Sequence, residues 1–152
     1  MSLDSVRAHL ARHAPDIEII EFDSPTATVQ EAAVAHGCEP GQIAKTLSLR
    51  IGDKVVLVVA RGDARLDNRK AKTAFGGKAK MLDAADVEAV TGHPVGGVSP
   101  FGLANPLPVY CDISLKAFDV VIPAAGSRNS SLKIEIDRLA ALVGADWIDV
   151  CE

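Results

Sequence analysis

The sequence predicts an α+β domain built on a mixed, largely antiparallel sheet that curls towards a barrel. Two observations lead to this fold class. Segments with the twofold periodicity of strands occur in hairpin-like pairs, and segments with helical periodicity are inserted between those pairs. The length of 152 residues suits one domain with a buried core, and no repeat or linker divides it. We therefore expect residues 1–152 to form a single domain.

The first forty residues contain signals for two helices and a short strand. Apolar residues at helical spacing predict a helix over Leu3–His13, followed by a strand over Ile17–Phe22. The second helix is marked more clearly. Thr28 and Glu31 have the spacing of a capping box, in which each side chain accepts a hydrogen bond from the other residue's backbone N–H. Gly37 provides the left-handed residue at which such a helix ends.

The next segment changes to the periodicity of a hairpin. Except for Lys45, alternate residues from Ile43 to Ile51 are aliphatic, which indicates a strand with one buried face. A turn at Gly52-Asp53 leads into the continuous apolar run Val55–Ala60, which is typical of a strand covered on both faces. A basic helix is then expected over Asn68–Phe75, ending at the glycine pair that follows it.

The remaining chain predicts two helices and three strands around an irregular stretch. Asp83 can cap a helix over 84–90, and the glycine- and proline-rich residues 92–108 are too broken for regular structure. The later elements are expected as strands at 109–113, 118–122 and 132–136, and a helix at 139–143 closed by Gly144.

Composition and charge restrict the classes of protein to which the chain can belong. The three cysteines are odd in number and far apart, the N-terminus lacks the apolar stretch of a secretory signal, and no run suffices to span a membrane. These features predict a cytoplasmic protein with no membrane partner. The net charge is −4, yet the segment Arg61–Lys80 carries seven basic and two acidic side chains. Such a segment is either a phosphate-attracting patch or an ordinary solvated helix face.

Lys45 is the most informative single residue. It shares strand parity with Leu47 and Leu49, so its side chain is expected on the apolar side of the strand. An ammonium there is costly unless it reaches water, an anion or a carbonyl. The functional interpretation is a cation that lines a cavity and faces a phosphate or a polarised carbonyl. The alternative is a strand that begins only at Thr46, which leaves Lys45 in a solvated loop.

The loop Gly96–Gly102 is the second candidate. Its two adjacent glycines allow close backbone approach and leave N–H groups uncovered, while Pro100 stiffens the far end. Such a loop can present donors to a developing oxyanion, or it can be a plain connection. The sequence lacks the motifs of other catalytic classes. It has no G-x-S-x-G elbow and no phosphate-binding P-loop, and its histidines and cysteines do not have the spacing of zinc ligands.

Three segments together resemble a known family. They are Ala44-Lys45-Thr46-Leu47, the run Val55–Ala60 with the Arg61-Gly62-Asp63 that follows, and the loop Gly96–Gly102 with its Gly-x-x-x-Pro pattern. In order and spacing they resemble the YbaK family of trans-editing deacylases, which is similar to the editing domain inserted in bacterial prolyl-tRNA synthetases. The resemblance extends over residues 28–143, and it implies the fold of that family.

The resemblance also implies a set of roles. Lys45 would hold the 3′-terminal adenosine or the aminoacyl ester, and Gly96 and Gly97 would contact the aminoacyl group as catalytic residues. Thr46, Ser99 and Pro100 would contribute to substrate binding. The family is thought to use neither a protein nucleophile nor a metal, and no cofactor is expected. Such chemistry is feasible because an aminoacyl ester is already reactive, so that positioning and electrostatic stabilisation supply much of the acceleration.

One segment departs from the family pattern. Residues 124–133 replace a glycine-rich stretch that ends in an acidic residue, and their Asn129 and Ser130 either line the pocket or belong to a surface turn. The implied substrate is a small amino acid mischarged on tRNA(Pro) or a related tRNA, with a synthetase as a possible partner and no role for DNA. The alternative is a non-catalytic module that binds tRNA or a synthetase. The deacylase reading requires Lys45 and the amides of residues 96–97 to share one cavity.

Overall fold

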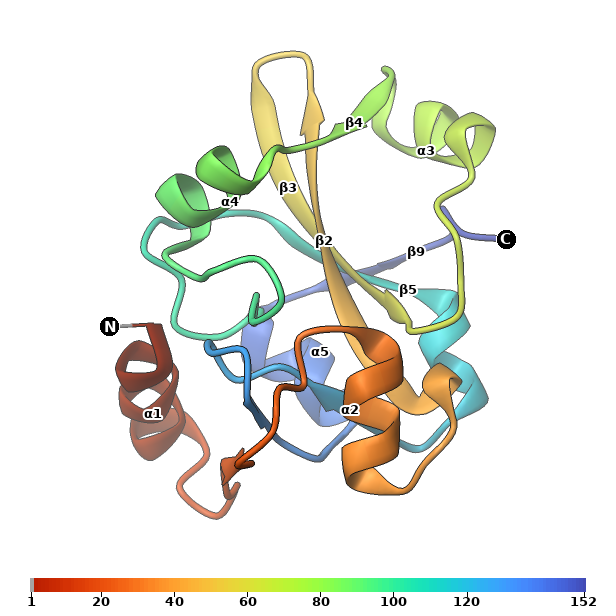
Figure 1. Ribbon diagram of the computed structural model, residues 1–152. Coiled ribbons are helices and arrows are strands. Elements are labelled where there is room, and N and C mark those ends of the chain that lie inside the picture. Colours follow the sequence, from red (N-terminus) through yellow and green to blue (C-terminus); the bar gives the residue numbers. More distant parts are fainter. Residues whose placement is uncertain (1) are drawn as a thin grey trace.

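The computed structural model describes residues 2–152. Figure 1 shows five α-helices arranged around a twisted sheet. The helices are α1 (Ser2–His13), α2 (Val29–His36), α3 (Asn68–Phe75), α4 (Ala84–Thr91) and α5 (Ile136–Val143). The strands are β1 (Ile20–Glu21), β2 (Ile43–Ile51), β3 (Lys54–Arg61), β4 (Ala79–Met81), β5 (Val109–Asp112), β6 (Val120–Pro123), β7 (Ser130–Ser131), β8 (Ile134–Glu135) and β9 (Asp146–Ile148). Two 3-10 helices, η1 (Pro40–Gln42) and η2 (Ile113–Ala117), precede β2 and follow β5.

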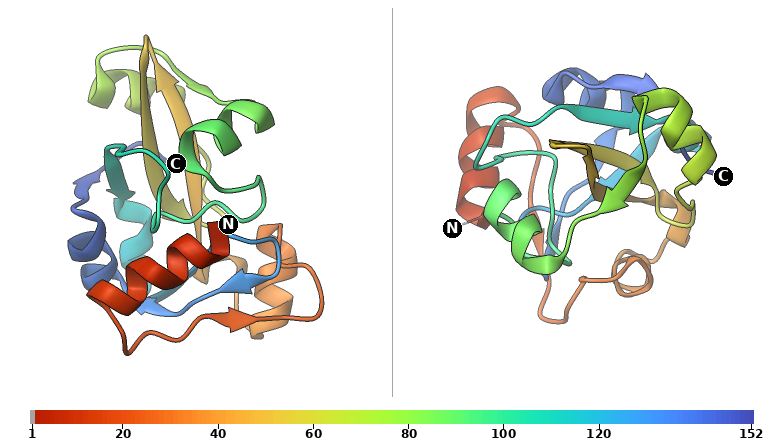
Figure 2. Two further views of the ribbon diagram at one scale, coloured as in Figure 1. Left: turned by 90° about the vertical axis from the view of Figure 1, so that its left-hand side faces the viewer. Right: turned by 90° about the horizontal axis from the view of Figure 1, so that it is seen from above.

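The predicted fold class is confirmed: the protein is α+β with a curled, mixed sheet. The main sheet has the strand order β8-β6-β2-β3-β5-β9, with β4 paired beside β2, and β1 pairs separately with β7. Within residues 2–152, four strand pairings are antiparallel and three are parallel. Both views of Figure 2 place α2 (orange) and α5 (blue) on opposite sides of the molecule.

The β2–β3 hairpin is the centre of the sheet, as the sequence predicts. It pairs without interruption from Ala44 opposite Arg61 to Ile51 opposite Lys54. The other edge of β2 is shared between two strands: β6 pairs with it at residues 43–44, and β4 pairs with it at residues 49–51. The Ser48 carbonyl accepts a hydrogen bond from the N–H of Leu82, just after β4. Residues 45–47 of β2 therefore lie between two diverging partners, so this edge is open along its middle.

The apolar core lies on both faces of β3. Leu57 and Val59 contact one cluster, which is covered by α1 and α5, whereas Val56 and Val58 contact a second cluster beside α3. Leu57, Val58 and Val59 are fully buried. This arrangement explains the uninterrupted apolar run, because a strand covered on both faces has no position for a solvated side chain.

Local signals predicted the helices better than the short strands. The capping box between Thr28 and Glu31 is present, and Gly37 ends α2 in the left-handed conformation at φ 65°. The strand predicted over 17–22 is limited to β1. The strand predicted over 132–136 is replaced by β7 and β8, because residue 136 already begins α5. The strands β4 and β9 were not predicted, since three-residue strands pair through the backbone and leave little periodicity.

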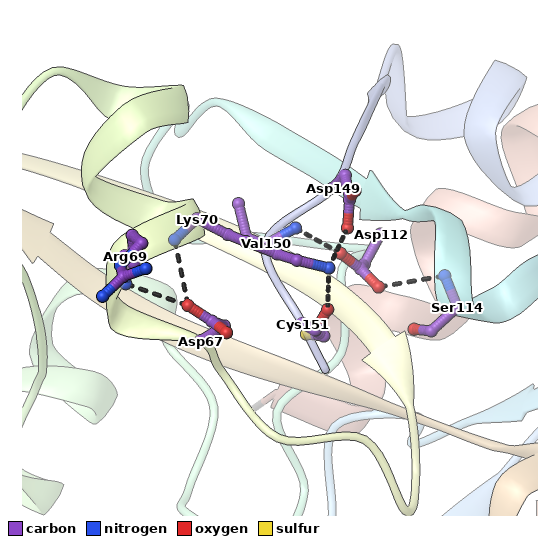
Figure 3. A network of polar contacts seen from close by, with 8 residues as sticks. All are labelled: Asp67, Arg69, Lys70, Asp112, Ser114, Asp149, Val150 and Cys151. Atoms are coloured by element: carbon purple, nitrogen blue, oxygen red, sulfur yellow. Dashed lines mark hydrogen bonds and ion pairs between the residues drawn. The ribbon is translucent and has the colours of Figure 1, made fainter.

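A set of polar contacts fixes the C-terminal residues to the sheet (Figure 3). Asp112, whose exposed fraction is 1%, accepts hydrogen bonds from the N–H of Ser114 at 2.9 Å and of Val150 at 2.8 Å. The ammonium of Lys70 donates to Asp149 at 3.1 Å and to the Cys151 carbonyl at 3.0 Å. We call these six residues the C-terminal clasp: Lys70, Asp112, Ser114, Asp149, Val150 and Cys151. The polar groups of the clasp hydrogen-bond to one another, so we assign the clasp a role in stabilising the fold.

The clasp also holds the loop that follows β3. The N–H of Asp67 donates to the Val150 carbonyl at 2.8 Å, and the N–H of Glu152 donates to the Arg65 carbonyl at 2.9 Å. This pairing positions Ala64, which contacts the second apolar cluster. Among the described residues, 2–152, no helix combines the length and the apolar character needed to cross a bilayer.

Candidate functional site

A cavity of about 230 Å³ lies beside the open edge of β2. Its wall is formed by α2 and the segment before it, by β2, by residues 81–82 at the end of β4, by α4, by the loop at residues 95–98, and by β6 and β7. Aliphatic side chains such as Val29, Ile43 and Ile122 cover much of this wall. The polar part consists of Thr26, Thr28, Lys45, Thr46, Ser48, Ser130 and Ser131. Segments from the whole length of the chain thus meet in one apolar hollow with a few polar groups, which is the usual composition of a small-molecule site.

Lys45 lies within β2 and lines the cavity, so the alternative in which the strand begins at Thr46 is wrong. Its ammonium donates a hydrogen bond to the Ala64 carbonyl, in the loop that the C-terminal clasp supports. Partial burial lowers the pKa of Lys45 from its ordinary value, and the nearby Cys151 and Asp63 oppose that shift. An ammonium has three donors, so Lys45 keeps donors for a substrate oxygen beyond the one given to Ala64.

Gly96 lines the same cavity, and its conformation requires glycine. Its φ is 90°, and a Cβ added there would lie 2.8 Å from the Cβ of Ala27. In residues 2–152 the N–H of Gly96 donates to no backbone carbonyl. Lys45 and Gly96 therefore border one concavity, which is the arrangement that the deacylase reading requires of them.

Apart from Val98, the rest of the glycine loop lies outside the cavity. The N–H of Gly97 already donates to the Pro94 carbonyl at 2.9 Å, so this amide is occupied where the sequence led us to expect an open one. Gly97 instead permits a close approach to the backbone of Ser127, 2.6 Å from where its Cβ would stand. Ser99 is fully buried and accepts a hydrogen bond from the N–H of Phe101. Pro100 borders a different hollow, beside His9.

The segment before α5 is divided in the same way. Ser130 lines the cavity, whereas Asn129 does not. The Asn129 side chain donates to the Phe22 carbonyl at 2.9 Å and accepts from the Ser127 hydroxyl at 3.0 Å, so it fixes the turn. Of the eight residues singled out from the sequence, the cavity thus brings together Lys45, Thr46, Gly96 and Ser130, and leaves aside Gly97, Ser99, Pro100 and Asn129.

Besides Thr28, which the sequence marked only as a helix cap, three polar lining residues were not singled out from the sequence. Thr26 precedes the capping box, Ser48 lies on the same face of β2 as Thr46, and Ser131 adjoins Ser130. Ser48 could have been predicted as a lining residue, because it lies two residues after Thr46 in the same strand and so on the same face. Thr26 and Ser131 had no such signal, because their place in the wall depends on how β7 and the segment before α2 meet β2.

Ser131 also has a notable partner. Its hydroxyl lies 2.6 Å from Nε2 of His36, at the end of α2, and burial lowers the pKa of that imidazole. The imidazole packs edge-on against Phe22 with ring centroids 4.9 Å apart. Among the described residues no carboxylate hydrogen-bonds His36, so the pair lacks the third member of a catalytic triad. Burial also raises the pKa of the Cys111 thiol to about 12, so that thiol is protonated at neutral pH.

Comparison with known proteins agrees with this geometry. Residues 23–142 match the aminoacyl-tRNA editing domain. Over its whole length the chain is 47% identical to the uncharacterized protein YwhH of Bacillus subtilis, and the match covers 98% of that protein. It is 30% identical to the "Putative Cys-tRNA(Pro)/Cys-tRNA(Cys) deacylase EbsC" of Enterococcus faecalis, over 81% of this chain and 76% of that one.

Two further relatives extend the comparison. The chain is 31% identical to a proline–tRNA ligase of Desulfovibrio desulfuricans, over 81% of this chain but only 21% of the ligase, so it corresponds to one segment of that enzyme. A crystal structure described as "a putative trans-editing enzyme for prolyl tRNA synthetase" superimposes with a TM-score of 0.92 at 34% identity, covering 99% of this chain and 97% of that one. With its fold, its cavity and its sequence all in agreement, this chain belongs to the family of aminoacyl-tRNA editing domains.

Proposed function

We propose that this chain is an aminoacyl-tRNA deacylase, which hydrolyses the ester between a small amino acid and a mischarged tRNA(Pro) or related tRNA. The observation that carries the proposal is the shared cavity. Lys45, Thr46, Gly96 and Ser130, from three distant segments, border one mainly apolar hollow. The family match and the editing relatives support the same reaction class.

The chemistry needs few protein groups. Water adds to the ester carbonyl, the carbonyl oxygen takes up negative charge, and expulsion of the ribose oxygen releases the amino acid and regenerates the terminal hydroxyl of the tRNA. Lys45 and the N–H of Gly96 are the donors that we assign to the substrate oxygens. Gly97, Ser99 and Pro100 act by holding the loop in place. Removing one donor to such an oxyanion typically slows a reaction by a factor on the order of 10²–10³.

The basic segment Arg61–Lys80 is the surface that we assign to the acceptor stem. Arg61 forms an ion pair with Asp63, and Lys70 with Asp149. Five further cations have no carboxylate within ion-pair distance among the described residues: Arg65, Arg69, Lys72, Lys78 and Lys80. All five are exposed, and β4, which carries Lys80, leads directly to the cavity wall at residues 81–82. Phosphates bound there would lie close to the cavity.

The test is hydrolysis of a panel of mischarged tRNAs by the wild type, by Lys45→Ala and by Lys54→Ala. Lys54 is an exposed lysine at the start of β3, far along the hairpin from the cavity, and so it controls for the loss of one positive charge. We expect Lys45→Ala to slow hydrolysis on the order of 10²-fold and Lys54→Ala to leave it unchanged. Tight binding of tRNA by the wild type without hydrolysis of any panel member would instead identify a binding module.

A further inference from the structure

Two buried hydroxyls in the cavity wall have no hydrogen-bond partner. In residues 2–152, four buried side-chain polar atoms lack one: Oγ1 of Thr26, Oγ1 of Thr46, Nε2 of His9 and Nδ1 of His93. Both hydroxyls belong to residues that line the cavity, whereas neither histidine does. Thr26 has an exposed fraction of only 6%, so bulk water does not compensate its hydroxyl.

Such groups are costly to the free protein. A buried hydroxyl without a partner loses its hydration and gains nothing in return, which is why buried polar groups in folded proteins are nearly always paired. Elsewhere in this chain buried hydroxyls do find partners: that of Thr91, which is fully buried, donates to the Val87 carbonyl at 2.7 Å. The missing partners of Thr26 and Thr46 therefore point to a ligand that supplies them.

The shape of the site indicates which part of a substrate reaches these hydroxyls. Thr26 is almost inaccessible and belongs to a wall that is mainly aliphatic, so only a small terminal group can approach it. The side chain of the amino acid is such a group, whereas the ribose and the base are larger and are attached to the rest of the tRNA. A threonine hydroxyl both donates and accepts, so its natural partner is another hydroxyl.

Building on the proposed deacylase function, we propose that Thr26 and Thr46 are specificity-determining residues that select an aminoacyl group with a hydroxyl-bearing side chain. Seryl and threonyl esters satisfy the two orphan hydroxyls. Alanyl and 2-aminobutyryl esters, which have nearly the same shape but no hydroxyl, leave them unpaired. A site built to hydrogen-bond a substrate group discriminates against the analogue without it, because the buried protein groups then lose their partners.

The experiment compares four esters carried on the same tRNA(Pro): seryl against alanyl, and threonyl against 2-aminobutyryl. For the wild type we expect kcat/KM to be at least about tenfold higher for the hydroxylated member of each pair. Thr26→Val and Thr46→Val remove a hydroxyl while nearly keeping the side-chain shape. Each should reduce that preference about 3- to 10-fold by slowing the hydroxylated ester alone. Thr73→Val, on the exposed face of α3, is the matched control. It lies in the basic segment, but any change in tRNA binding affects both esters of a pair equally, so the ratios should stay unchanged.

A stability measurement separates recognition from a structural role. Because the hydroxyl of Thr26 has no partner in the free protein, Thr26→Val should keep or raise the melting temperature while it lowers the discrimination. Equal rates for the two members of each pair, or an equal loss on both in the valine variants, overturn this inference and leave the deacylase function standing. No hydrolysis of any mischarged tRNA by the wild type overturns both.

Discussion

The C-terminal clasp and the cavity treat buried polar groups in opposite ways. In the clasp, the buried carboxylate of Asp112 accepts two backbone N–H groups, and Lys70 has two acceptors. In the cavity, the hydroxyls of Thr26 and Thr46 have none. The clasp therefore pairs its buried polar groups within the protein, whereas the cavity leaves two buried hydroxyls for a ligand. Substitutions in the clasp should alter stability, and substitutions in the cavity should alter activity.

The largest effect is expected at Asp112. Asp112→Ala leaves the N–H groups of Ser114 and Val150 without an acceptor, at a cost of about 2–4 kcal/mol in the free energy of unfolding. Asp149→Ala removes only the exposed ion pair with Lys70 and should cost less than about 1 kcal/mol. Urea denaturation measures both variants. Similar losses for the two would show that the buried carboxylate is not the centre of the clasp.

In the cavity, Gly96→Ala should lower the rate of hydrolysis rather than the stability. The added Cβ meets Ala27 at 2.8 Å and the backbone has a φ of 90°, so the loop must shift and hydrolysis should fall on the order of 10²-fold. Gly52→Ala is the control, because Gly52 also has a positive φ, 63°, but nothing within 4 Å. Steady-state deacylation compares the two. Equal losses of activity would attribute the effect to backbone strain rather than to the site.

Acidification should weaken the fold through its buried imidazoles. Burial lowers the pKa of both His36 and His93 from the ordinary value of 6.5, so below that pH the unfolded chain binds protons that the folded chain resists. Stability is therefore complete above pH 6.5 and declines as the pH falls, until the folded-state pKa values are passed. Melting temperatures between pH 8 and 5 measure this. His93→Gln should flatten the decline, and an unchanged slope for this variant would contradict the assignment.

The smallest effect concerns the basic segment. Lys78→Ala should reduce the slope of log affinity for tRNA against log salt by about one, with little change in the rate at saturating substrate. Lys54→Ala is again the control, since it lies outside the segment. Filter binding at several salt concentrations checks this, and a slope identical to that of the wild type would exclude Lys78 from the phosphate contacts.

Sequence reasoning succeeded where a feature depends on neighbouring residues. The hairpin of β2 and β3, the capped α2 and the bounds of α3 each follow from periodicity and end signals within a few positions. The side of the strand on which Lys45 lies could also be predicted, because Lys45 alternates in step with Leu47 and Leu49. The role of the glycine loop could be predicted only in part. The N–H of Gly97 donates to the Pro94 carbonyl, and the composition of the loop does not determine that turn. Thr26 and Ser131 were missed because their neighbours in space are distant in sequence.

The divided edge of β2 has a consequence for the order in which the cavity is assembled. The hairpin can form as soon as residues 43–61 are available, but β6, which closes one end of the cavity, begins only about sixty residues after the hairpin ends. Closing so long a loop is slow compared with forming local structure. A nascent or truncated chain that stops before β6 thus possesses the central hairpin without a binding site, and recovery of catalysis during refolding should lag behind recovery of helical signal.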